Sequence, residues 1–217
     1  MFIGHFAVAF GAKRMVPAVS LGSMFLAAQL ADLLWPNFVL LGIEQVEVAP
    51  GITAVTPLDF VSYPYSHSLL SLTLWGALAA LVYRALGRSW LEGATVALVV
   101  LSHWALDALS HRPDMPLAFG PTRVGLGLWN SVPATIVVEG ALFLFGVAIY
   151  TRVTRARDRI GRAGLWSLVA LLIVIYAANF LGPPPPGVAA VAWTAQAIWL
   201  LVAWAYWVDG HRDPSRG

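Results

Sequence analysis

Two long stretches without a charged side chain limit what this 217-residue chain can fold into more than any other feature. Asp59 and Arg84 flank 24 uncharged residues, and Arg162 and Asp209 flank 46. A helix that crosses a bilayer needs about 20 apolar residues, so each stretch is long enough for at least one crossing. Hydrophobic residues make up 59% of the chain and charged residues 11%, which excludes a soluble globular protein and a disordered one.

Six apolar segments have about the length that a bilayer requires. They are residues 16–35, 66–86, 91–110, 131–151, 164–181 and 188–208. Peptide groups in hydrocarbon must be paired internally, and these segments lack the alternation of barrel strands, so we expect helices. The sequence therefore predicts a single integral membrane domain over residues 1–217, an all-α transmembrane bundle with six long spans.

Lysine and arginine are divided unequally between the two ends of this arrangement. Only Arg112 and Arg123 fall at one end. The other end holds Lys13, Arg14, Arg84, Arg88, Arg152, Arg155, Arg157, Arg159, Arg162, Arg212 and Arg216. Cytoplasmic loops are enriched in basic residues, so this end, with the C-terminus and the basic loop 152–163, is predicted to be cytoplasmic in a bacterial inner (plasma) membrane. Loops 36–65 and 111–130 are then outer loops.

Two of these loops have compositions that indicate a role. The arginines of loop 152–163 can form a nucleic-acid patch or a topology determinant that meets anionic membrane lipids, and in a short loop between spans we favour the second. We therefore expect no nucleic-acid partner. The outer loop 36–65 contains no Lys or Arg. We expect a short interfacial helix over residues 37–47 and an irregular lid over residues 50–60.

Ionisable side chains inside the predicted spans mark a candidate site. They are Asp32, His103, Asp107 and Glu139, and His67 begins the second span. Inserting such a group costs about 2.5–3.5 kcal/mol, so each indicates a functional site or a buried pair. All five are expected at a similar depth, toward the outer face.

The segment SHWALDALSH carries the most specific local spacing. His103, Asp107 and His111 are four residues apart and therefore share one helix face. Imidazole and carboxylate together suit Zn²⁺, Mn²⁺ or Fe²⁺ better than Mg²⁺ or Ca²⁺. The alternative is a structural hydrogen-bonded pair within the membrane, and the spacing alone leaves both interpretations open.

Four short motifs follow one another in the first half of the chain. They are GHFAVAFGAKR, the aspartate of AQLADLLWP, PYSHSLL and LSHWALD. In this order they resemble the signatures of the membrane-bound metal-dependent hydrolases, the YdjM-like group. The resemblance implies a divalent metal ion, zinc in the first place and manganese or iron as alternatives. It implies as ligands His5, Asp32, His67, His103 and Asp107.

With such a site, we expect metal-assisted hydrolysis of a phosphoester or ester in an amphipathic, lipid-like substrate near the outer face. Glu139 either takes a proton as the catalytic base or orients a histidine ligand. His111 and Asp114 lie just outside the membrane, where they either bind a polar headgroup of the substrate or form a rigid turn.

His5 is a membrane thickness away from the other residues if the N-terminus lies on the cytoplasmic surface. The conflict disappears if residues 2–12 form a short helix that descends from the outer half, because eleven residues cover about 16 Å. Lys13 and Arg14 can then reach the cytoplasmic interface. We therefore expect a short N-terminal membrane helix besides the six long spans, with the N-terminus on the outer side.

Two other classes of function remain open. In a small proton-coupled transporter or permease, the intramembrane residues Asp32, His103, Asp107 and Glu139 form a relay. In a non-catalytic membrane scaffold, the same residues hold a structural metal. Metal content, measured with and without the His103→Ala substitution, is the observation that narrows these alternatives most.

Overall fold

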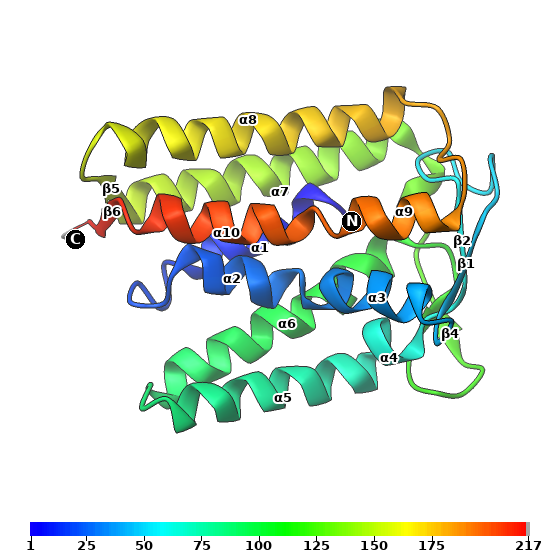
Figure 1. The fold of residues 1–217 in the computed structure, drawn as a ribbon, viewed down its shortest axis with the longest axis horizontal. Helices are drawn as coiled ribbons and strands as arrows, with labels where there is room; N and C mark the ends of the chain where they lie inside the picture. Colours follow the sequence, from blue (N-terminus) through cyan, green and yellow to red (C-terminus); the bar gives the residue numbers. More distant parts are fainter. Residues whose placement is uncertain (216–217) are drawn as a thin grey trace.

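The computed structural model describes residues 1–215 and shows a helical bundle with short strands at its two ends (Figure 1). The helices are α1 (Ile3–Ala12), α2 (Leu21–Ala28), α3 (Leu30–Leu40), α4 (Pro64–His67), α5 (Leu69–Ala85), α6 (Trp90–Ser110), η1 (Leu128–Asn130), α7 (Val132–Val153), α8 (Arg159–Leu181), α9 (Val188–Ala195) and α10 (Ile198–Asp209). The strands are β1 (Gln45–Val48), β2 (Leu58–Ser62), β3 (Met115–Pro116), β4 (Arg123–Val124), β5 (Thr154–Ala156) and β6 (Arg212–Pro214). They form three antiparallel pairs, β1 with β2, β3 with β4 and β5 with β6.

Within residues 1–215, four helical segments are long and apolar enough to cross a membrane: α6, α7, α8 and the unit Val188–Asp209 formed by α9 and α10. Helices α2 and α3 pass the same test only together and are bent by 50°. Helix α5 has 17 residues and falls short. The expectation of six long spans is therefore not confirmed; the helices support four spans, or five with the bent pair.

Local capping explains why the second expected span is interrupted. The side chain of Ser68 accepts a hydrogen bond from the backbone N–H of Ser71, and Ser68 itself has an extended backbone with ψ 150°. This is the usual start of a helix. The short α4 consequently ends at His67, and a separate helix, α5, begins at Leu69.

The loop of residues 36–65, called the outer loop after its predicted side, is more regular than expected. Helix α3 continues to Leu40 and ends before Gly42, which has a φ of +71° and adopts this left-handed conformation at little steric cost. Residues 45–48 then pair with residues 58–62 as a hairpin. The expected helix over residues 37–47 and the irregular lid over residues 50–60 were therefore wrong in detail.

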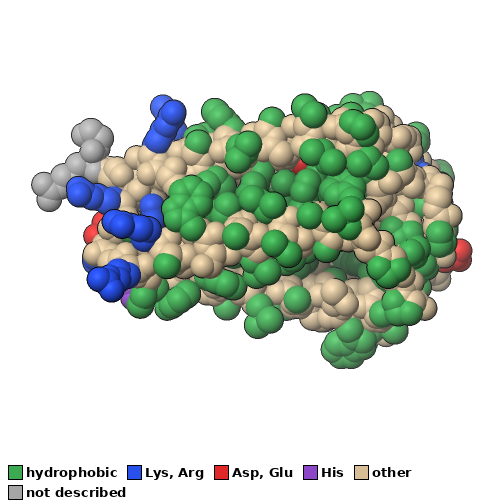
Figure 2. All heavy atoms as spheres, turned by 90° about the horizontal axis from the view of Figure 1, so that it is seen from above, with side chains coloured by type: hydrophobic (Ala, Val, Ile, Leu, Met, Phe, Trp, Pro, Cys, Tyr) green, Lys and Arg blue, Asp and Glu red, His purple; other side chains and the backbone are tan. Residues whose placement is uncertain are grey.

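The two ends of the bundle differ in charge. Figure 1 places residues 13–20, 86–89 and 154–158 at one end, and residues 41–63, 111–131 and 182–187 at the other. Figure 2 shows Lys and Arg side chains gathered at the first end and hydrophobic side chains over the middle of the bundle. Arg216 lies outside the described residues. Together with the four apolar helices, this distribution is compatible with a membrane protein.

Helix α1 lies inside the bundle, against α2, α6 and α7, and its N-terminus is in the middle of the long axis (Figure 1). Eight of its ten residues are buried. Helix α7 approaches it closely at Gly146, where an added Cβ atom would lie 2.3 Å from the carbonyl oxygen of Ala7. This close approach fixes the position of the helix that carries His5.

Gly146→Ala is expected to lower the stability of the protein by about 1–3 kcal/mol, because the added methyl group forces α1 and α7 apart. Thermal unfolding in detergent measures the change. Gly140→Ala is the matched control on the same helix, since a Cβ atom there meets nothing within 4 Å. Equal unfolding temperatures for the two variants would show that the close approach is not needed.

Candidate metal centre

Five side chains from four helices converge in one cluster. His5 comes from α1, Asp32 from α3, His67 from α4, and both His103 and Asp107 from α6. His67 Nε2 lies 3.4 Å from Asp32 Oδ1 and 3.9 Å from Asp107 Oδ2. His103 Nε2 lies 3.9 Å from Asp32 Oδ1. The structure thus brings together all five residues that the sequence predicted as ligands.

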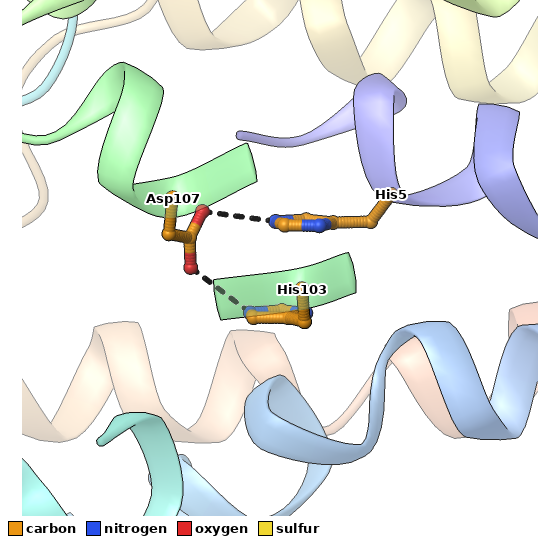
Figure 3. Close-up of side chains that lie close together, drawn as sticks. All are labelled: His5, His103 and Asp107. Carbon is orange, nitrogen blue, oxygen red and sulfur yellow. Dashed lines mark hydrogen bonds and ion pairs between the residues drawn. The ribbon is translucent and has the colours of Figure 1, made fainter. Parts of the chain in front are cut away.

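Asp107 joins two histidines through its two carboxylate oxygens (Figure 3). Oδ1 lies 3.0 Å from His5 Nε2, and Oδ2 lies 3.0 Å from His103 Nε2. The amino group of Met1 also contacts Oδ1. The rings of His5 and His103 stack with centroids 3.7 Å apart and an interplanar angle of 2°. His5 therefore contacts Oδ1 of Asp107, whereas His67 and His103 lie next to Oδ2.

The hydrogen bond of His103 defines which of its nitrogens carries the proton. Its Nδ1 lies 2.7 Å from the carbonyl oxygen of Ala28, which can only accept, so Nδ1 donates. In the neutral ring, Nε2 then offers a lone pair. This buried atom has no hydrogen-bond partner among the described residues, although Asp107 Oδ2 is 3.0 Å away. Two acceptors that face each other need a proton or a metal cation between them.

The break between α2 and α3 supplies this carbonyl group. Ala28 is the last residue of α2, and Gln29 separates the two helices. Carbonyl groups at a helix end lack a partner within the helix. The 50° bend therefore presents the end of α2 to His103 and the first turn of α3, with Asp32, to the cluster.

A buried carboxylate, Glu44, orients His67 through a serine. Ser66 Oγ donates to Glu44 Oε2 at 2.6 Å and lies 2.7 Å from His67 Nδ1. Because the serine proton is given to Glu44, Ser66 Oγ accepts from Nδ1–H, and His67 Nε2 keeps its lone pair for the cluster. Glu44 Oε1 also accepts from the backbone N–H groups of Tyr65 and Ser66, at 2.8 and 2.9 Å.

The sequence analysis did not identify Glu44 as a functional residue. It is only 1% exposed, although it lies in the outer loop between α3 and β1. The one signal in the sequence is that this loop contains acidic residues and no Lys or Arg to pair with them. Ser66, which donates a hydrogen bond to Glu44, directly precedes the predicted ligand His67.

The donor atoms have the spacing that one divalent ion requires. Tetrahedral zinc with bonds of 2.0–2.2 Å places neighbouring ligand atoms about 3.3–3.6 Å apart. Two groups have ligand atoms within 4.8 Å of one another: Asp32, His67 and His103, and His5, His103 and Asp107. Both groups use His103, whose single free nitrogen binds one ion. The buried histidines and aspartates can therefore hold a metal ion in either group.

The cluster is open to the surroundings at Asp32. The Asp32 side chain is 29% exposed, whereas the side chains of the other four residues are no more than 4% exposed. A substrate or water molecule that reaches the cluster therefore meets Asp32 first.

Glu139 contacts the N-terminus of α1. Its Oε2 accepts from the backbone N–H of Phe2 at 2.8 Å and of Gly4 at 3.3 Å, and the residue is 1% exposed. The first N–H groups of a helix have no partner within the helix, so this carboxylate stabilises the first turn of α1. Through that turn it also positions His5.

His111 and Asp114 form part of a buried network in the outer loops. His111 Nδ1 lies 2.9 Å from Asp114 Oδ1, and Tyr63 donates to the same oxygen at 3.1 Å. Arg112 donates to Asp114 Oδ2 at 3.0 Å. Burial lowers the pKa of His111; burial opposes ionisation of Asp114, but the hydrogen bond from His111 helps to bring its pKa below the usual value. These contacts fit the interpretation of a rigid turn.

No protein-family model, curated protein or solved structure matches this chain. The cluster itself and the four sequence motifs that supply its residues are therefore what indicates a function.

Proposed function

We propose that this chain is a membrane-embedded, metal-dependent hydrolase of the YdjM-like kind. The observation that carries the proposal is the convergence of two free imidazole nitrogens with the carboxylates of Asp32 and Asp107. His103 Nε2 is buried 3.0 Å from Asp107 Oδ2, and this pair of atoms needs a proton or a metal cation between them; the nearby Asp32 and His67 favour the metal.

The best placed ligands are Asp32, His67 and His103, whose ligand atoms all lie within 4.8 Å of one another, and Asp107 Oδ2 lies within 4 Å of both imidazole nitrogens. His5 then orients Asp107 from its other oxygen, which is the common role of a residue next to a ligand. The mixture of imidazole and carboxylate favours zinc, with manganese or iron as alternatives. A bound divalent ion lowers the pKa of a water molecule to about 7 and polarises a phosphoryl or acyl oxygen.

The surroundings of the cluster support an amphipathic, lipid-like phosphoester or ester as the substrate. The bundle exposes apolar side chains over its middle (Figure 2), so a hydrophobic molecule can approach from the bilayer. The basic end is the cytoplasmic end by the distribution of charge, in a bacterial inner membrane with a cytoplasmic C-terminus. The outer loop contributes Glu44, and the reaction accordingly takes place toward the outer face.

Elemental analysis of the purified protein tests the proposal first. We expect about one divalent ion per chain in the wild type and none in His103→Ala, since a catalytic site of this kind binds a single ion. Release of phosphate from short-chain phosphatidic acid and of fatty acid from a fluorogenic ester then tests turnover. A wild-type protein that binds no metal would overturn the proposal.

Glu139 is a buried carboxylate at the first turn of α1, the helix that carries His5, and it is the candidate proton acceptor. Glu139→Gln is expected to retain the metal and lose turnover, because the amide oxygen still accepts from Phe2 and Gly4 but takes no proton. Metal content and hydrolysis are measured on the same preparation. Loss of the metal would instead assign Glu139 a role in holding the ligands, and unchanged turnover would exclude proton transfer.

The 50° bend between α2 and α3 favours a second candidate function. Transporters place their binding sites at such broken helices, with ionisable residues as a proton relay. Proton uptake by proteoliposomes without bound metal would support a small proton-coupled transporter. A tightly bound metal without hydrolysis or transport would support a scaffold with a structural metal.

A further inference from the structure

The basic end of the bundle contains a pocket of about 320 Å³, far along the chain from the cluster residues. It is formed by the end of α7, the paired strands β5 and β6, and the first two turns of α8. Its polar and aromatic lining includes Thr151, Thr154, Arg155, Arg162, Trp166 and Arg212. Three arginines and no carboxylate therefore line one small space.

One of the three guanidinium groups is fixed in place. Arg212 donates from Nε to Thr154 Oγ1 at 3.0 Å, from Nη1 to the Gly161 carbonyl at 2.8 Å, and from Nη2 to the Thr154 carbonyl at 3.1 Å. Thr154 is itself only 3% exposed. All three acceptors are neutral and the guanidinium lies over the ring of Tyr150, so the positive charge is held rigidly with no acidic partner among residues 1–215.

The other two arginines are available to a ligand. Among residues 1–215, the ion pairs of arginine involve Arg88 and Arg112, so neither Arg155 nor Arg162 has an acidic partner. The nearby Asp158 is occupied, because it accepts from Gly161 N–H at 2.8 Å and pairs with His211 at 2.6 Å. Asp213 lies opposite Arg155 in the strand pair and is exposed. The pocket thus has an excess of positive charge.

The surface next to the pocket indicates which anion it receives. Trp166 is 54% exposed, and most of the exposed side chains farther along α8 are apolar, including Ile173 at 45% and Val174 at 63%. Tryptophan is enriched where hydrocarbon meets the headgroups, and basic pockets between membrane helices on the cytoplasmic side bind anionic headgroups. A soluble phosphate would not use this apolar border, whereas the acyl chains of a lipid would.

We propose that this pocket binds the phosphate group of an anionic phospholipid. Arg155 and Arg162 contact the phosphate oxygens, for which the planar guanidinium is well suited. Arg212 adds a fixed charge, and Trp166 lies at the boundary with the acyl chains. The proposal stands on different residues from the metal centre and does not depend on it.

Lipid titration of the full-length protein in a zwitterionic detergent tests this inference. The variant Arg155→Gln/Arg162→Gln is compared with Arg152→Gln/Arg159→Gln, which removes the same charge from exposed residues outside the lining. Phosphatidylglycerol should raise the unfolding temperature of the wild type and the control, and phosphatidylcholine should not. We expect binding of phosphatidylglycerol to be about 30-fold weaker in the pocket variant and less than about threefold weaker in the control.

Three results would overturn the proposal. Equal weakening in both double variants would indicate general attraction by the basic end. An equal shift with inorganic phosphate alone would make the ligand a soluble anion. An equal shift with phosphatidylcholine would remove the requirement for a negative charge. If the pocket variant does not fold, Arg155→Lys/Arg162→Lys keeps the charge and should still bind phosphatidylglycerol more weakly than the wild type.

Discussion

Replacement of Asp32 by alanine is expected to reduce the metal content of the purified protein to background. Asp32 Oδ1 lies within 4 Å of both His67 Nε2 and His103 Nε2, so its loss removes a ligand from the centre of the cluster. The protein should stay folded, because removing a partly buried carboxylate also relieves a cost of burial. Elemental analysis and thermal unfolding of the same sample measure the two effects.

Asp107→Asn should have the same effect on the metal with a larger effect on stability. Asp107 contacts His5, His103 and the amino group of Met1, and breaking a buried charge pair costs about 3–5 kcal/mol. Glu47→Ala is the control for both variants, since Glu47 is an exposed carboxylate on the outer hairpin. Unchanged metal content in both aspartate variants would contradict the metal centre and favour a transporter.

Glu44→Gln is expected to weaken metal affinity by about 10–100-fold, although Glu44 is not among the proposed ligands. If the amide oxygen of the glutamine still accepts hydrogen bonds from the backbone N–H groups of Tyr65 and Ser66, its amide nitrogen faces Ser66 Oγ. Ser66 then has to accept from the amide and donate to His67 Nδ1. The proton of His67 moves to Nε2, and the lone pair for the metal is lost.

Competition with a chelator measures this change in affinity. Glu47→Gln is the matched control, and Ser66→Ala should weaken the affinity as well because it removes the link between Glu44 and His67. A purely structural role for Glu44 would lower the unfolding temperature without changing affinity in the folded protein. Wild-type affinity in Glu44→Gln would therefore reject a positioning role for Glu44.

The membrane character and the division of charge could be predicted from the sequence because both are properties of continuous segments. The length of an apolar run decides whether a helix can cross a bilayer, and helices α6, α7 and α8 closely follow the expected segments. The pairing of His103 with Asp107 was equally predictable, since residues four apart share a face of any helix. Asp32 and His67 were expected near them from their predicted depth in the membrane, whereas for His5 only the resemblance of short motifs indicated a common site.

The remaining features depend on contacts between helices, and only the tertiary structure decided them. The break at Gln29 lets the Ala28 carbonyl accept from His103, 75 residues away along the chain. Glu44 reaches Ser66 because the outer loop folds back against α4, and Glu139 reaches α1 across 135 residues or more. Apolar periodicity records which face of a helix is buried but not which neighbour covers it. The sequence by itself therefore determined the long apolar helices and the types of ligand, whereas packing decided where helices break and which nitrogen and which oxygen face each other.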